Sequence, residues 1–172
     1  SMDKNNLSFK DSLINAQKLG YAEANPLSDL NGNDVSSKLK ILSSLCFNTY
    51  ISDKIYVEGI NEVDQVDIIN ANNLGYKIKL LGCAEFSKNK ITQRVHPCLI
   101  KKSSYIASID GVLNAVIVDG YPVGQSIIQG EGAGPEATTS ALVSDISSIL
   151  RGNIKYPFAI SNKERKNVGY DS

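Results

Sequence analysis

Apolar residues recur along this chain with two different periods, and these periods predict which segments are helices and which are strands. The helical spacing is found in four segments, residues 8–19, 34–47, 63–74 and 137–150. Strand-like runs are found in five, residues 55–58, 76–86, 91–100, 113–118 and 123–129. Ser87-Lys88-Asn89 and Asp119-Gly120 supply turn residues, so the last four strands are expected to form two hairpins.

The order of these elements predicts an α/β protein of the α+β type. Strands grouped in hairpins, rather than alternating strictly with helices, argue against a doubly wound parallel sheet. We expect a mixed, largely antiparallel sheet with helices mainly on one face. The aliphatic residues of segment 113–129 are expected to belong to the core. A length of 172 residues suits one domain, which we place at residues 1–152, followed by a tail at 153–172.

Composition excludes several classes of function. Eighteen basic and 18 acidic residues give no net charge, which argues against a nucleic-acid partner. No apolar run approaches ~20 residues, so no membrane span is expected, and the polar start shows no signal peptide. The three cysteines have no C-x-x-C spacing and are interpreted as buried thiols of a cytoplasmic protein. Without clustered Cys or His no metal site is predicted, and His96 is expected to be structural, at a strand end.

An acidic, turn-rich loop leading into the second helix carries the candidate chemistry. Glu23 and Asp29 lie in the loop, where Asn25, Pro26, Asn31 and Gly32 disfavour regular structure, and Asp34 and Lys38 follow at the helix start. Asp34 and Lys38 share a helix face because they are four residues apart. The pair is typical of a surface ion pair with a helix-capping acid. A lysine among carboxylates can also transfer protons if the site is dry.

A longer pattern favours the chemical interpretation. Ala16-Gln17-Lys18-Leu19-Gly20-Tyr21-Ala22-Glu23 opens it and Lys38-Leu39-Lys40-Ile41-Leu42 closes it. Further matches are Ala71 to Leu81, Val95-His96-Pro97, Asn114-Ala115-Val116 and Gly130-Glu131-Gly132-Ala133-Gly134. Together they resemble the catalytic domain of homoserine dehydrogenase over most of residues 7–150, with the last match similar to the G-x-G-A-G turn of that family.

The resemblance implies a function and a set of site residues. The family interconverts L-homoserine and L-aspartate 4-semialdehyde with NAD or NADP, in threonine and methionine biosynthesis. It implies that Lys38 is the catalytic proton donor and acceptor. Glu23, Asp29, Asp34 and the main chain near Tyr21 would bind the amino acid substrate. The resemblance also implies a homodimer paired through its sheets, which supports an interface as the alternative to a core for residues 113–129.

The cofactor would be bound mainly by an N-terminal nucleotide-binding domain, which this chain is expected to lack. The implied contacts from this chain are the backbones of Gly130, Gly132 and Gly134, where glycine permits a close approach. These glycines are equally typical of a plain strand-to-helix turn. No strand, G-x-G-x-x-G and helix unit of the dinucleotide-binding type is found in the sequence. We therefore expect the 172 residues alone to be inactive.

Two other functions are considered. The first is a non-catalytic dimerisation module of the same fold, in which Glu23, Asp34 and Lys38 would matter only for stability. The second is another semialdehyde or sugar-phosphate dehydrogenase, which would need a cysteine thiolate as nucleophile. None of the three cysteines lies in the acidic loop, so we rank this possibility last.

Overall fold

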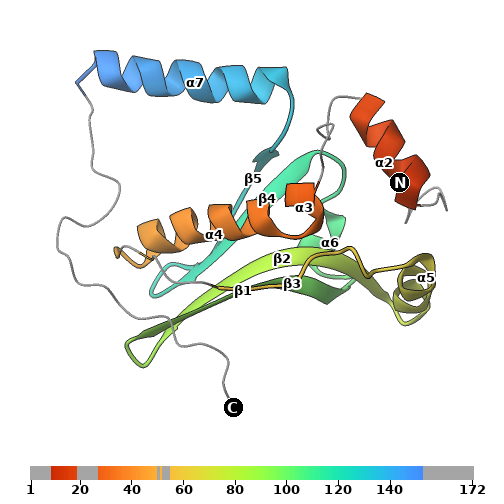
Figure 1. The fold of residues 1–172 in the computed structure, drawn as a ribbon. Coiled ribbons are helices and arrows are strands. Elements are labelled where there is room, and N and C mark those ends of the chain that lie inside the picture. The colour runs from red at the N-terminus through yellow and green to blue at the C-terminus, as the bar shows by residue number, and fades with distance from the viewer. Residues whose placement is uncertain (1–8, 19–26, 50, 52–54, 153–172) are drawn as a thin grey trace.

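The computed structural model describes residues 9–18, 27–49, 51 and 55–152, whose strands form two separate sheets (Figure 1). In chain order the elements are α2 (Phe9–Lys18), α3 (Leu27–Leu30), α4 (Asn33–Cys46), β1 (Tyr56–Val57), α5 (Gln65–Asn73), β2 (Tyr76–Ser87), β3 (Lys90–Lys101), α6 (Tyr105–Ser108), β4 (Leu113–Gly120), β5 (Gly124–Glu131) and α7 (Pro135–Leu150). The predicted helices and strands are all found among them. Within this part of the chain no helix is long and apolar enough to cross a membrane.

The larger sheet has the strand order β1-β3-β2. Strands β2 and β3 form the predicted antiparallel hairpin, in register from Tyr76 opposite Lys101 to Ser87 opposite Lys90. Lys88 and Asn89 make its turn with positive φ angles of 49° and 64°. β1 joins the other side of β3 in parallel. The expected α+β fold with a mixed, largely antiparallel sheet is therefore confirmed.

The core lies between α4 and this sheet (Figure 1). Side chains alternate between the two faces of a strand, and Ile91 and Val95 on one face of β3 are completely buried. On β2, Gly82 lets the helix approach, since a Cβ there would lie 3.1 Å from Cγ1 of Val35 and 3.4 Å from Cβ of Leu39. Leu39 is itself buried. This packing fixes α4 on the sheet.

The β4–β5 hairpin forms the second sheet and is followed by α7. Its register runs from Leu113 opposite Glu131 to Gly120 opposite Gly124. Every residue of β5 is exposed. The expectation that the aliphatic residues of 113–129 belong to the core is therefore wrong for β5, because no other described element covers that strand. Large apolar residues of α7 are exposed as well, namely Leu142, Val143, Ile146, Ile149 and Leu150.

Local sequence explains where the helices begin and end. Asp64 caps α5 in a reciprocal capping box. The Asp64 carboxylate accepts a hydrogen bond from the N–H of Asp67, and the Asp67 carboxylate accepts one from the N–H of Asp64. Pro135 stands in the first turn of α7, where its missing N–H costs nothing. Ser8 and Gly20, the predicted boundaries of the first helix, lie outside the described residues.

Three local expectations are corrected by the structure. Residues 27–30 form the single-turn helix α3 instead of irregular loop, and α6 was not predicted at all. Both helices have only four residues, too few to show a period. None of the three cysteines is fully buried, since Cys46 is exposed and Cys83 and Cys98 are half-buried. His96 and Pro97 lie inside β3 instead of at a strand end.

Candidate active site

The candidate site is built on the tight connection between α3 and α4. The carbonyl of Leu30 accepts a hydrogen bond from the N–H of Ile60, 2.8 Å away, beyond the end of β1. A Cβ at Gly59 would collide with the backbone oxygen of Leu30 and would lie 2.6 Å from Cα of Asn31. The segment after β1 therefore touches the α3–α4 turn directly, backbone to backbone. This contact sets where α4 begins.

Two neighbouring residues complete the start of α4. Gly32 adopts a left-handed conformation with φ 81°, which glycine reaches without steric cost. A Cβ there would lie 3.0 Å from Cγ1 of Val57 and 3.2 Å from Cγ1 of Val95, so the turn also sits close to the sheet. The side chain of Asn31 then accepts a hydrogen bond from the N–H of Asn33 at 3.1 Å, which satisfies one of the free donors at the helix start.

Asp34 and Lys38 follow in the first two turns of α4. Lys38 Nζ lies 2.8 Å from Asp34 Oδ2, and the two side chains are 55% and 39% exposed. An exposed i,i+4 pair contributes only about 0.3–0.5 kcal/mol to stability. The predicted pairing is confirmed, and its position on a fixed helix start orients the ammonium group. The pair therefore contributes little to holding the fold together.

The structure describes two of the predicted substrate-binding residues, Asp29 and Asp34. Asp29 lies on α3, which packs against α4, the helix that carries Asp34 and Lys38. Its carbonyl accepts a hydrogen bond from Gly32 at 3.4 Å. Glu23 and Tyr21 lie outside the described residues, and their roles stay predictions.

The three candidate cofactor-binding glycines lie elsewhere, at the end of the β4–β5 hairpin and the start of α7. Two of them are explained by the fold itself. A Cβ at Gly132 would collide with the side-chain amide of Asn114. Gly134 has φ 113° and ψ 157°, a conformation essentially restricted to glycine. The structural interpretation of the turn therefore accounts for Gly132 and Gly134.

Gly130 is different, and it bears on the fit of a cofactor. It lies in β5 opposite Asn114, and a Cβ there would meet no atom within 4 Å. When no neighbouring atom would clash with a side chain, a glycine inside a strand often marks a place where a ligand or another backbone approaches closely. The exposed backbone at Gly130 is therefore compatible with the edge of a nucleotide held from outside this hairpin.

The alternative function, a dehydrogenase with a cysteine nucleophile, is not supported by the environment of Cys98. Burial raises the pKa of the Cys98 thiol, and the nearby Arg94 opposes that shift only in part. A raised pKa keeps the thiol protonated near neutral pH, whereas nucleophilic cysteines are thiolates. His96 lies between these two side chains, with Nε2 accepting from Arg94 Nε at 3.1 Å and Nδ1 3.5 Å from Cys98 Sγ. His96 therefore has a structural environment within the sheet.

Sequence reasoning missed two residues that position the site. Asn31 was interpreted as a loop former only, although its spacing to Asn33 is that of an Asx turn. The role of Gly59 has no local signal, because its contact with Leu30 joins segments far apart in the sequence. Among the described residues, no group of three or more His, Cys, Asp or Glu side chains is arranged to hold a metal ion.

Comparisons with known proteins identify the family of this chain. The family model described as homoserine dehydrogenase matches residues 1–147. The homoserine dehydrogenase of Helicobacter pylori is 46% identical over 151 residues, which cover 87% of this chain and 36% of that protein. A crystal structure of a homoserine dehydrogenase from Thiobacillus denitrificans superposes with a TM-score of 0.82 at 43% identity, covering 91% of this chain and 36% of that one.

A more distant structure carries a nucleotide. A mutant of a hyperthermophilic archaeal homoserine dehydrogenase, solved in complex with NADPH, matches with a TM-score of 0.64 at 25% identity, covering 88% of this chain and 42% of that one. This chain thus spans little more than a third of the length of the Helicobacter pylori and Thiobacillus denitrificans enzymes. By the extent of the family match and the shared fold, the chain belongs to the homoserine dehydrogenase family.

Proposed function

We propose that residues 1–152 form the substrate-binding and subunit-pairing part of a homoserine dehydrogenase that interconverts L-homoserine and L-aspartate 4-semialdehyde with NAD or NADP. One observation carries the proposal, the 2.8 Å Asp34–Lys38 pair. It stands on a helix start held by the backbone contact between Leu30 and Gly59, within the segment that matches the family.

The proposed roles follow from the charges of the substrate. Homoserine carries an ammonium group, which a carboxylate binds through charge-assisted hydrogen bonds. Asp29 supplies a carboxylate on α3, and Glu23 is proposed to supply a second one. The nicotinamide exchanges a hydride with the carbon that bears the substrate oxygen. Lys38 gives a proton to that oxygen as the aldehyde is reduced and takes it back in the reverse direction. Asp34 holds the ammonium group of Lys38 in place.

A chimeric enzyme tests this function. Residues 1–147 of this chain replace the matching segment of the Thiobacillus denitrificans enzyme, which supplies the remaining two thirds of the protein. We expect homoserine-dependent formation of NADPH or NADH by the chimera. We expect no turnover by the 172 residues alone, because no element described here would hold hydride donor and acceptor in contact.

The outcomes separate the candidate functions. A folded chimera without homoserine-dependent turnover would favour the non-catalytic dimerisation module. Turnover by the 172 residues alone would contradict the proposed division of labour between the two parts. The unmodified Thiobacillus denitrificans enzyme, assayed in parallel, serves as the reference.

We also propose that two copies of this chain pair through the β4–β5 sheet. The side of the hairpin that carries Val116 and Ile128, which face each other across the strands, includes the 67% exposed Ile128. An exposed apolar sheet face is typical of a protein–protein interface. The sheet-mediated pairing implied by the family resemblance agrees with this location.

Replacing Ile128 by lysine is expected to convert the dimer into a monomer, because the charge would be buried without a partner. Gln125→Lys is the matched control, since it adds the same charge on the same strand but on the opposite side. Sedimentation velocity at micromolar concentration measures the result. A parent chain that sediments as a monomer, or an Ile128→Lys variant that remains dimeric, would contradict this interface.

A further inference from the structure

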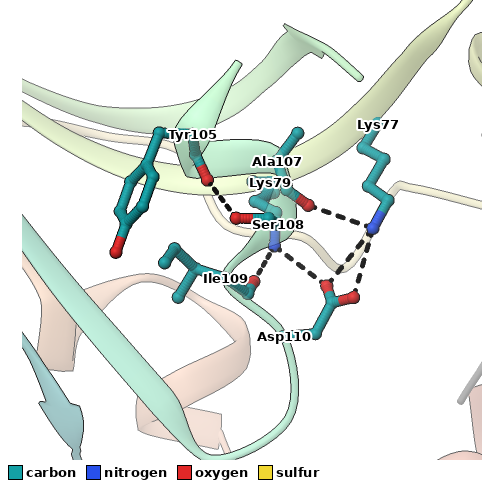
Figure 2. A network of polar contacts seen from close by, with 7 residues as sticks. All are labelled: Lys77, Lys79, Tyr105, Ala107, Ser108, Ile109 and Asp110. Atoms are coloured by element: carbon teal, nitrogen blue, oxygen red, sulfur yellow. Dashed lines mark hydrogen bonds and ion pairs between the residues drawn. The ribbon is translucent and has the colours of Figure 1, made fainter. Parts of the chain in front are cut away.

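A polar cluster joins β2 to the segment that leads into the β4–β5 hairpin (Figure 2). Lys77 and Lys79 lie two residues apart and extend from the same side of β2. Lys77 Nζ lies 3.2 Å from Asp110 Oδ2 and donates to the carbonyl of Ala107 at 3.0 Å. Lys79 Nζ lies 3.2 Å from Asp110 Oδ1 and donates to the carbonyl of Ile109. The two lysines thus hold both α6 and the residues just after it.

The same segment is tied to the hairpin at its other side. The hydroxyl of Tyr105, at the start of α6, donates a hydrogen bond to Gln129 Oε1 in β5 at 2.7 Å. The backbone of Asp110 accepts from the N–H of Leu113, the first residue of β4. Residues 105–110 therefore contact the large sheet on one side and both hairpin strands on the other.

Little else fixes the hairpin in the described part of the chain. Strands β4 and β5 pair with each other and share few close contacts with α4, β2 or β3. Every residue of β5 is exposed. The orientation of the hairpin, and of the glycine turn at its end, thus depends strongly on residues 105–110.

Charge makes Asp110 the central residue of this cluster. One carboxylate stands between two ammonium groups, and all three side chains are largely withdrawn from solvent, 20% exposed for the lysines and 32% for Asp110. Loss of the Asp110 charge would leave two ammonium groups close together without the carboxylate that lies between them. Loss of one lysine charge would leave a balanced pair. Interactions of this kind are stronger at partly buried sites than on the surface.

We propose that Lys77, Lys79 and Asp110 are positioning residues that hold the glycine turn of residues 130–134 in a fixed orientation relative to the Lys38 helix. The catalytic part of this proposal rests on the proposed function, because Lys38 and the glycine turn would face the same substrate and cofactor from separate elements. The cluster acts through the hairpin and touches neither reactant.

Distance measurements on the chain itself test the geometric part. Spin labels are placed at the exposed Cys46 on α4 and at Gln125→Cys in β5, in a background with Cys83→Ser and Cys98→Ser, diluted with unlabelled chain. Double electron–electron resonance should give a narrow distance distribution for the parent and a clearly broader one for Asp110→Asn. Asp119→Asn, an exposed carboxylate on the same hairpin, is the matched control and should leave the distribution narrow.

Two further variants keep the test decisive. Lys79→Met, which leaves Lys77 and Asp110 paired, should broaden the distribution less than Asp110→Asn, and Asp110→Glu should restore the narrow form. Both are measured even if Asp110→Asn fails to fold. An unchanged width in Lys79→Met, or no restoration by Asp110→Glu, would overturn the proposal.

Kinetics in the chimeric enzyme test the catalytic part. Asp110→Asn is expected to lower kcat by roughly 10- to 100-fold, the effect of a small misalignment of reacting groups, with KM for homoserine nearly unchanged. If kcat fell and the KM for homoserine rose by the same factor, a positioning role would be contradicted. If the unmodified chimera shows no turnover, the proposed function fails, while the distance measurements still decide whether the cluster fixes the hairpin.

Discussion

Replacing Lys38 by alanine in the active chimera is expected to lower kcat by about 10²–10⁴-fold, the usual contribution of a positioned acid–base group. The reason is that the oxygen of the substrate must gain or lose a proton as the hydride moves, and Lys38 is held for this by Asp34 at 2.8 Å. Thermal stability should change little, because the pair is exposed and contributes only about 0.3–0.5 kcal/mol. Steady-state kinetics and a thermal melt measure both effects.

Two further variants separate proton transfer from charge. Lys38→Arg retains a cation beside Asp34 but cannot release a proton at accessible pH, so its kcat should remain as low as that of Lys38→Ala. Lys40→Ala removes a neighbouring lysine from the same helix and should leave kcat unchanged. A normal kcat in Lys38→Ala would reduce Lys38 to a surface ion-pair residue, and an active Lys38→Arg would show that charge alone is required.

The second large effect is expected at Gly59, which contacts no reactant. The Cβ of an alanine at this position would collide with the backbone oxygen of Leu30 and would lie 2.6 Å from Cα of Asn31. These are backbone atoms, which cannot move aside as the end of a flexible side chain can. Overpacking of this kind costs about 1–3 kcal/mol. The melting temperature should fall by about 2–4 °C for each kcal/mol lost. Because the α3–α4 turn must shift, activity should fall as well.

Gly120→Ala is the control for this substitution. A Cβ at Gly120 would meet no atom within 4 Å, and the residue has no positive φ. The variant should therefore keep the parent melting temperature or exceed it slightly, because alanine reduces the freedom of the unfolded chain. A Gly59→Ala variant that melts with the parent and retains full activity would show that the turn does not depend on this contact.

The long elements of the fold were predictable because each has a period or a turn signal. The β2–β3 hairpin was predicted from two apolar runs on either side of Ser87-Lys88-Asn89. In the structure Lys88 and Asn89 both have positive φ angles and make the turn that sets its register. By contrast, helix α3 was not predicted, because the turn-forming residues on either side of it indicate an irregular loop. The exposure of β5 could not be predicted, since an aliphatic strand has the same pattern whether its own chain or another covers it.

The site was predictable only where it is local. Asp34 and Lys38 are one helical turn apart, so spacing alone predicted their pairing. The lysines at 77 and 79 alternate with apolar residues and were interpreted simply as part of a strand. Their partner Asp110 lies more than 30 residues away along the chain. Only the folded structure shows that these charges meet.

The position of Pro97 has a consequence for association in solution. β1 pairs with β3 only at Arg94 and Val95, and Glu58 donates to the carbonyl of Val95 at 2.8 Å. Since backbone groups alternate along a strand, Pro97 faces the same edge just beyond the end of β1, where the described part of the chain places no further strand. Proline offers no N–H there, so a foreign strand would find an interrupted ladder. We therefore expect Pro97 to disfavour edge-to-edge pairing with another chain, at a point where the 60% exposed Leu99 would otherwise favour it.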